Sequence, residues 1–191
     1  MVQDPAALPR DFPVPTDDGA ADHLPGAAMP VLKLPSTAGG SVRVDRPPAG
    51  ASRMVLYAYP RTGEPGAEPL HPDWDRIPGA RGCTPQACGF RDHAGELAEW
   101  GAAVAGVSTQ DSGYQAEVAQ RLSLGFPLLS DAGLRLATAL RLPTFEVAGQ
   151  ILLRRLTMIV RAGWIERVWY PVFPPDRHAE QVLGWLRAVA V

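Results

Sequence analysis

The only two cysteines of this 191-residue chain, Cys83 and Cys88, lie five positions apart in the segment "RGCTPQACGFRD". A thiol can act as a nucleophile, as a metal ligand or as half of a disulfide. The segment is typical of the first turns of a helix, in which five residues rise about 7.5 Å. A disulfide seldom joins Cα atoms more than about 7 Å apart, so an intact helix keeps these two thiols from reacting with each other.

The position of Cys83 favours a reactive thiolate. It follows Gly82 at a junction between a loop and a helix, where unpaired backbone N–H groups and the helix dipole stabilise negative charge. Cys88 lies one and a half turns further in and lacks this advantage. A thiolate that attacks a peroxide becomes a sulfenic acid, and a second thiol can condense with it to form a disulfide. An asymmetric pair of this kind requires local unwinding between the two cysteines.

Two other interpretations of the cysteines are weaker. Buried helix cysteines with only a packing role would be inert. A zinc site would need four ligands, and the histidines of the chain show no familiar zinc spacing relative to the cysteines. We therefore expect no metal and no cofactor, and we interpret His93 as a solvated helix histidine rather than a base. The four histidines are His23, His71, His93 and His178.

The composition of the chain does not indicate a macromolecular partner. The net charge is −2 and charges of both signs are scattered along the chain, so we expect no nucleic-acid partner. The start of the chain does not resemble a secretory signal, and no apolar run reaches the roughly eighteen residues of a membrane span. We expect no membrane partner and a cytoplasmic location. In such a compartment a cysteine pair favours redox chemistry over a permanent bridge.

The elements around the cysteines alternate between strand and helix patterns. Residues 1–28 are expected to form an irregular N-terminal extension, and residues 29–191 a single domain. The C-terminal helix follows Pro175 and has an apolar face of Val182, Leu183, Leu186 and Val189. The other expected elements are a hairpin in 31–45, a buried strand at 52–60, a helix from Thr84 to Trp100, a strand at 102–110, a helix at 112–124, a strand at 126–131, a helix at 132–142 and an antiparallel hairpin over 150–172 that turns at Ala162-Gly163.

This order predicts an α/β protein with the thioredoxin-like fold, in which helices flank a central mixed sheet and a β-hairpin extends the N-terminal side. Residues 61–82 are crowded with Gly and Pro and are expected to form an unusually long loop. Loops of this length inside a compact domain are uncommon, so we interpret this one as functional or lid-like rather than as a simple connector.

The segments "VLYAYPRTG", "GCTPQACGFRD" and "VAGVSTQD" closely resemble the Q-type peroxiredoxins, the bacterioferritin comigratory protein group of AhpC/TSA-like redoxins, and the likeness covers residues 29–188. The resemblance implies a thiol-dependent peroxidase for hydrogen peroxide and organic hydroperoxides. It implies that Cys83 is peroxidatic, that Cys88 is resolving and that the two form a disulfide. It also implies recycling by thioredoxin or a glutaredoxin-like dithiol donor, and a monomer or weak homodimer.

The family also has an arginine on a late strand, two residues before Ser or Thr, and "RRLT" puts Arg155 at that position. Strand alternation sends Arg154 and Arg155 to opposite faces, so one of them can point inward; the alternative leaves both in solvent at an edge or end. An inward Arg155 would supply charge-assisted hydrogen bonds to a thiolate and to a developing oxyanion.

The chain departs from the family pattern at Ala80, where relatives have a threonine three residues before the peroxidatic cysteine. Two substitutes are open at this stage. Either Thr62 folds back to supply a hydroxyl, or backbone donors and Thr84 bind the peroxide. The same departure leaves a second function open, in which a non-enzymatic thioredoxin-fold sensor or partner-binding module uses the disulfide as a switch.

Overall fold

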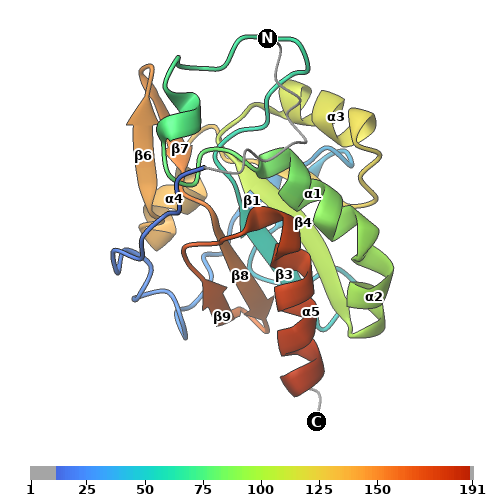
Figure 1. The fold of residues 1–191 in the computed structure, drawn as a ribbon. Coiled ribbons are helices and arrows are strands. Elements are labelled where there is room, and N and C mark those ends of the chain that lie inside the picture. The colour runs from blue at the N-terminus through green and yellow to red at the C-terminus, as the bar shows by residue number, and fades with distance from the viewer. Residues whose placement is uncertain (1–11, 190–191) are drawn as a thin grey trace.

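A computed structural model describes residues 12–189 (Figure 1). The first eleven residues of the expected N-terminal extension lie outside the described residues. The centre is a five-stranded sheet in the order β5-β4-β3-β8-β9. The pairs β3–β4 and β4–β5 are parallel, whereas β3–β8 and β8–β9 are antiparallel, which confirms the predicted mixed sheet. These strands are β3 (Arg53–Ala58), β4 (Ala102–Ser108), β5 (Leu128–Ser130), β8 (Leu156–Arg161) and β9 (Trp164–Trp169).

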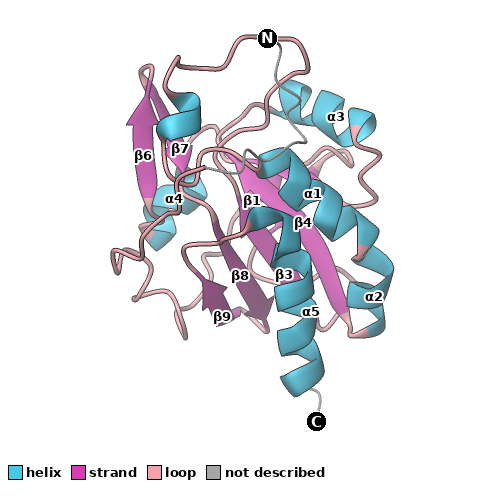
Figure 2. Ribbon diagram, in the orientation of Figure 1, coloured by secondary structure: helices cyan, strands magenta, loops and turns pink. Residues whose placement is uncertain are grey.

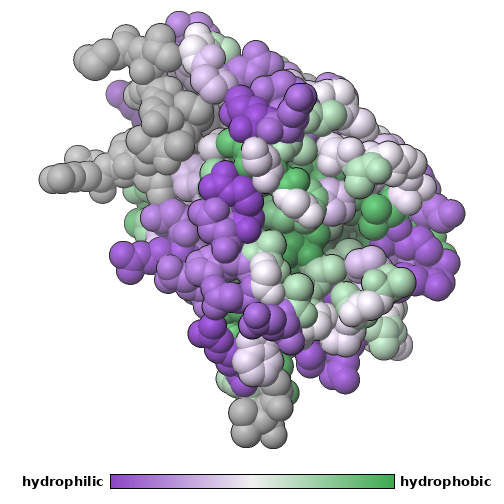
Figure 3. All heavy atoms as spheres, turned by 90° about the vertical axis from the view of Figure 1, so that its right-hand side faces the viewer, coloured by the Kyte–Doolittle hydropathy of each residue, from purple (hydrophilic) through white to green (hydrophobic). Residues whose placement is uncertain are grey.

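Helices cover both faces of this sheet (Figure 2). Alternation along β3 explains the layers, because Leu56 packs into one core cluster with Leu136 of α4, and Tyr57 packs into the other with Phe90 of α1 and Leu183 of α5. The helices are α1 (Cys83–Asp92), α2 (Ala94–Glu99), α3 (Ser112–Arg121), α4 (Arg135–Leu140) and α5 (His178–Val189), with 3₁₀ turns η1 (Trp74–Arg76) and η2 (Pro175–Arg177). Figure 3 shows the surface on the side of α2 and α3, where hydrophilic side chains surround a smaller apolar area.

The N-terminal hairpin predicted within 31–45 is confirmed as β1 (Lys33–Pro35) paired antiparallel with β2 (Ser41–Arg43). Ahead of it, residues 12–28 form no helix and no extended strand, yet Leu24 is fully buried in the core. None of the helices between residues 12 and 189 is both long and apolar enough to cross a membrane.

The helix expected from Thr84 to Trp100 is broken at His93. That residue has φ −102° and ψ 7°, and it separates α1 from α2. The His93 ring lies 2.8 Å from a carboxylate oxygen of Glu96, at the start of the second helix. The break lets Leu97 pack into the same core cluster as Phe90. The apolar spacing predicted from the sequence runs through both helices, whereas the break between them was not predicted.

The run from 150 to 161 is two strands rather than one. β7 (Gln150–Leu153) pairs with β6 (Thr144–Val147) in a separate two-stranded sheet, and β8 then joins the central sheet. The sequence predicted the β8–β9 hairpin at Ala162-Gly163 but neither the break at Arg154–Arg155 nor β6. In α5, Val189 is exposed, contrary to the expected apolar face, whereas its three other members are buried.

The crowded packing around Gly106 of β4 yields a stability prediction. A Cβ added to Gly106 would lie 2.7 Å from both Leu128 Cδ2 and Tyr57 Cζ, and Tyr57 is itself stacked on Phe90 with ring centroids 4.8 Å apart. Gly106→Ala should therefore lower the free energy of unfolding by about 1–3 kcal/mol, measured by urea denaturation. Gly184→Ala in α5 is the control, because it meets open space and should raise that free energy by about 1 kcal/mol. A Gly106→Ala protein as stable as the wild type would contradict this packing.

Candidate active site

Cys83 is the first residue of α1 and is almost fully buried. Gly82 before it has φ 100° and ψ 11°, a left-handed conformation that a glycine adopts without strain. The first intrahelical hydrogen bond runs from Gln86 N to Gly82 O at 3.0 Å. The N–H groups of Cys83 and Thr84 therefore have no partner within the helix, and Pro85 has no N–H to satisfy. The local backbone thus presents the positive end of a helix to the thiol.

Arg155 lies beside this thiol and is 3% exposed. Its Nη2 donates to Cys83 Sγ at 3.1 Å. The same nitrogen contacts the carbonyl oxygens of Gly79 at 3.2 Å and Arg81 at 2.9 Å, while Nη1 donates to Gln86 Oε1. A buried guanidinium in this position stabilises negative charge on the sulfur and on an oxygen bonded to it.

Arg154 points elsewhere. Its guanidinium lies over the ring of Phe145, 5.8 Å from the centroid, and the residue is only partly buried. The two arginine side chains point in different directions, as the sequence predicted. They lie in the break between β7 and β8, however, rather than in the middle of one strand. At this break the chain passes from one sheet to the other, and Arg155 is directed towards the start of α1.

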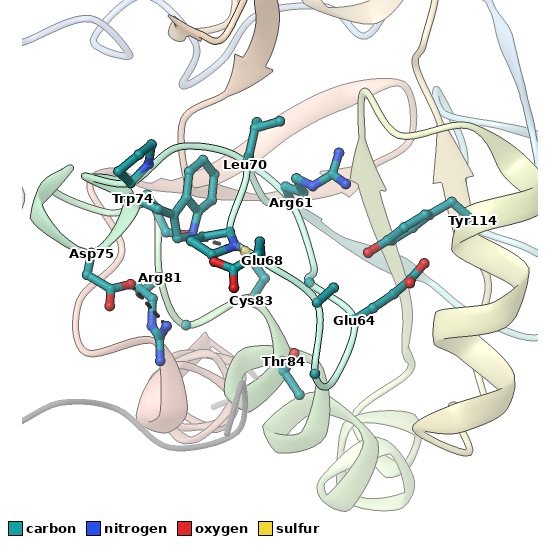
Figure 4. Close-up of a pocket in the computed structure, with 17 residues that line it drawn as sticks. Arg61, Glu64, Glu68, Leu70, Trp74, Asp75, Arg81, Cys83, Thr84 and Tyr114 are labelled. Carbon is teal, nitrogen blue, oxygen red and sulfur yellow. Dashed lines mark hydrogen bonds and ion pairs between the residues drawn. The ribbon is translucent and has the colours of Figure 1, made fainter. Parts of the chain in front are cut away.

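Thr62 and Thr84, the two possible substitutes for the threonine hydroxyl of the family, lie in different surroundings. Thr84 is buried next to Cys83 and lines the same cavity (Figure 4). The Thr62 hydroxyl donates instead to Gln110 Oε1 at 3.1 Å, and the Thr62 carbonyl accepts a hydrogen bond from the Tyr114 hydroxyl at 2.8 Å. The expectation that Thr62 folds back to the thiol does not agree with this geometry, because its hydroxyl is used to hold the start of the long loop.

Ala80 takes the position of the missing threonine. Its methyl group is fully buried, and its carbonyl oxygen lies 3.6 Å from Cys83 Sγ, within reach of a weak S–H hydrogen bond. The polar groups around the sulfur are therefore Arg155, this carbonyl and the backbone at the start of α1.

Cys88 is partly exposed, and both cysteines are free thiols. On an intact helix the five-residue spacing separates them by about 7.5 Å along the axis and about 140° around it. Arg91 lies beside the second thiol, and the pKa of its guanidinium is raised first by the hydrogen bond to Asp92 and further by Cys88. The intact α1 therefore holds the reduced thiols apart.

A cavity of about 430 Å³ opens above Cys83. The 61–82 loop forms most of its wall, with Leu70 and Trp74 on the apolar part, and α3 adds Tyr114 (Figure 4). The sequence predicted a functional or lid-like loop but not the roles of Trp74, Tyr114 or Gln86. A large aromatic residue inside a Gly- and Pro-rich loop was the available signal for Trp74.

The α1–α5 contact behind the thiols contains a buried histidine. His178 packs edge to face against Phe90 and Trp169, with ring centroids 5.7 Å away in each case. Its Nδ1 lies 3.0 Å from Gln181 Oε1. Burial lowers the pKa of His178 from 6.5 to about 4, the hydrogen bond to Gln181 opposes this shift, and the charge of Arg155 adds to it. A neutral imidazole therefore supports the helix that carries both cysteines.

Comparison with known proteins shows the family of the chain. The Redoxin family model matches residues 24–183. The chain is 27% identical over 164 residues to the chloroplastic peroxiredoxin Q of Suaeda salsa, covering 86% of this chain and 68% of that protein. It is 29% identical over 134 residues to the chloroplastic peroxiredoxin Q of Arabidopsis thaliana, covering 70% of this chain and 54% of that protein.

Solved structures show the same likeness. Peroxidoxin BcpB from Mycobacterium tuberculosis matches with a TM-score of 0.68 and 29% identity, covering 87% of this chain and 97% of that one. Xanthomonas campestris peroxiredoxin Q matches with a TM-score of 0.64 at 22% identity, covering 95% of this chain and 99% of that one. At this identity the match supports the fold alone.

The mixed sheet and a thiol at the start of a sheet-packed helix define a thioredoxin-like thiol protein. The chain belongs to the redoxin family and, within it, to the Q-type peroxiredoxins. It is therefore an oxidoreductase that acts on peroxides.

The buried histidine predicts a pH dependence of stability. Below pH 6.5 the unfolded chain protonates this imidazole, whereas the folded protein does not until about pH 4. The free energy of unfolding should fall as the pH drops through this window, by up to about 1.4 kcal/mol for each pH unit. The advantage of wild type over His178→Gln in urea denaturation should shrink from pH 7 to pH 4.5. His71→Gln, on the loop, is the control and should follow the wild type; an unchanged advantage would contradict a neutral His178.

Proposed function

We propose that Cys83 is the peroxidatic nucleophile and that Arg155 activates the reaction. The observation that carries this proposal is the 3.1 Å contact between Arg155 Nη2 and Cys83 Sγ at the start of α1. The thiolate attacks one peroxide oxygen, the O–O bond breaks, and the electron pair of that bond leaves on the distal oxygen. The sulfur keeps the attacked oxygen as a sulfenic acid, and the leaving oxyanion takes a proton to become water or an alcohol. The guanidinium stabilises the charge that develops on that oxygen.

Cys88 then resolves the sulfenic acid. Its thiol attacks the Cys83 sulfur, a disulfide forms and water leaves. Because the two thiols lie on different sides of an intact α1, the first turns must unwind before this step. Unwinding breaks the contacts of Arg155 with Cys83 and with Gln86, so the loss of the peroxide site and the formation of the disulfide are linked.

A dithiol donor of the thioredoxin or glutaredoxin-like type then reduces the disulfide in this proposal. Family membership favours this enzymatic cycle over the non-enzymatic switch. We also propose a cytoplasmic location, where such donors keep thiols reduced, and a monomer or weak homodimer. Cell fractionation and sedimentation velocity test these two points: recovery outside the cytoplasm or a tight dimer would overturn them.

Removing each thiol separates the two roles. Cys83→Ser should abolish peroxide consumption, whereas Cys88→Ser should still undergo one fast oxidation but fail to turn over with thioredoxin and accumulate sulfinic acid at Cys83. Stopped-flow peroxide consumption and intact-protein mass spectrometry measure both outcomes. Loss of the first oxidation in Cys88→Ser alone would reverse the assignment.

The arginine pair offers a matched comparison. Arg155→Ala should slow the oxidation of Cys83 by roughly 100-fold, because a preorganised donor to the developing charge is lost. Arg154→Ala removes a neighbouring guanidinium that lies over Phe145, and its oxidation rate should stay near that of the wild type. Single-turnover oxidation by hydrogen peroxide is the measurement, with urea denaturation to verify that both variants are folded. Equal rates for the two variants would argue against the proposed role of Arg155.

A further inference from the structure

We propose that the 61–82 loop adapts this peroxiredoxin to bulky, uncharged organic hydroperoxides. The carbon skeleton would lie against Leu70 and Trp74, and the O–O group would lie at Cys83. The inference rests on the proposed function and assigns these two loop residues a role in substrate selection.

The size of the cavity above Cys83 is the first argument. Its volume of about 430 Å³ lies within the range of about 300–1,000 Å³ typical of sites for organic ligands. A water molecule takes up only about 30 Å³ of liquid, and hydrogen peroxide is only one oxygen atom larger. Hydrogen peroxide would leave most of the cavity filled with solvent, whereas an aryl or alkyl hydroperoxide could displace that solvent from the apolar wall and gain binding energy.

The wall itself is firmly anchored. Trp74, in η1, is 8% exposed and clusters with Leu152 of β7, and its ring centroid lies 6.5 Å from that of Phe145 on β6. Leu70 packs against the same cluster. The β6–β7 hairpin therefore supports the loop from behind, and an apolar surface is presented to the cavity in a fixed place. An anchored wall can contribute to selectivity because little of its binding energy is lost in ordering the loop.

The charges around the cavity disfavour an anionic substrate. Arg81 forms an ion pair with Asp75 at 3.0 Å, and the Arg61 guanidinium lies 5.2 Å from the centroid of the Tyr114 ring. The exposed carboxylates of Glu64 and Glu68 line the same cavity (Figure 4). A fatty-acid hydroperoxide would bring a further carboxylate towards these two, whereas its methyl ester would not.

Steady-state kinetics with one thioredoxin system tests the inference. The kcat/KM for cumene hydroperoxide should exceed that for hydrogen peroxide by about tenfold or more, the scale of discrimination that apolar pockets provide. Leu70→Ala, which removes part of the wall, and Leu70→Phe, which fills part of the cavity, should each lower this ratio by several-fold. Ile77→Ala is the matched control, because Ile77 belongs to the same loop and the same cluster but is not among the residues that line the cavity; its ratio should equal that of the wild type.

A second comparison addresses charge. Linoleic acid hydroperoxide should be reduced more slowly than its methyl ester, and Glu68→Gln should narrow the difference. If hydrogen peroxide is reduced as fast as cumene hydroperoxide, or if both Leu70 variants keep the wild-type ratio, the substrate inference is overturned while the peroxidase function stands. Consumption of neither peroxide would instead overturn the proposed function, and the substrate inference with it.

Discussion

The buried guanidinium of Arg155 is the constraint around which this site is organised. It joins three segments that are far apart in the sequence, namely the end of the long loop, the first turns of α1 and the junction between β7 and β8. A buried cation is costly unless its hydrogen-bond donors are satisfied, and here carbonyls, an amide oxygen and a thiol accept from its two terminal nitrogens. The arrangement that lowers the cost of burying the arginine is also the arrangement that presents a cation to the sulfur.

The break in the strand pattern at Arg154–Arg155 determines where Arg155 and the β6–β7 hairpin lie. A continuous strand from 150 to 161 could not pair with β6 in one sheet and with β3 in another. The change of sheet leaves the two arginines outside regular pairing and brings the β6–β7 hairpin behind the long loop. One local interruption therefore serves both the activating side chain and the wall of the cavity.

Much of the fold could be predicted from the sequence, because apolar periodicity marks the strands of the central sheet and the helices that cover it. The order of these elements and the cysteine motif were sufficient for the family. The break at His93 could not be predicted from apolar periodicity, because Phe90 and Leu97 fit one helical stripe although they lie on two helices. The use of the Thr62 hydroxyl was also hidden, since its partner Gln110 is 48 residues away and only the tertiary structure brings the two together. The four-residue β6 is too short to show a clear alternating pattern. It could not be predicted as a strand without knowing that β7 pairs with it.

The Nη2 nitrogen of Arg155 is surrounded by more hydrogen-bond acceptors than it has hydrogens. That nitrogen has only two hydrogens, so in the reduced protein the carbonyls of Gly79 and Arg81 and the sulfur of Cys83 compete for them. When Cys83 leaves, two hydrogens remain for two carbonyls, and no donor on this nitrogen is left without an acceptor. Withdrawing the sulfur therefore avoids the full penalty of an unsatisfied buried donor. The guanidinium can therefore hold the thiol in place for attack and release it without leaving Nη2 short of an acceptor, although the contact of Nη1 with Gln86 is lost in the same step; the end of the loop stays bound to the same side chain.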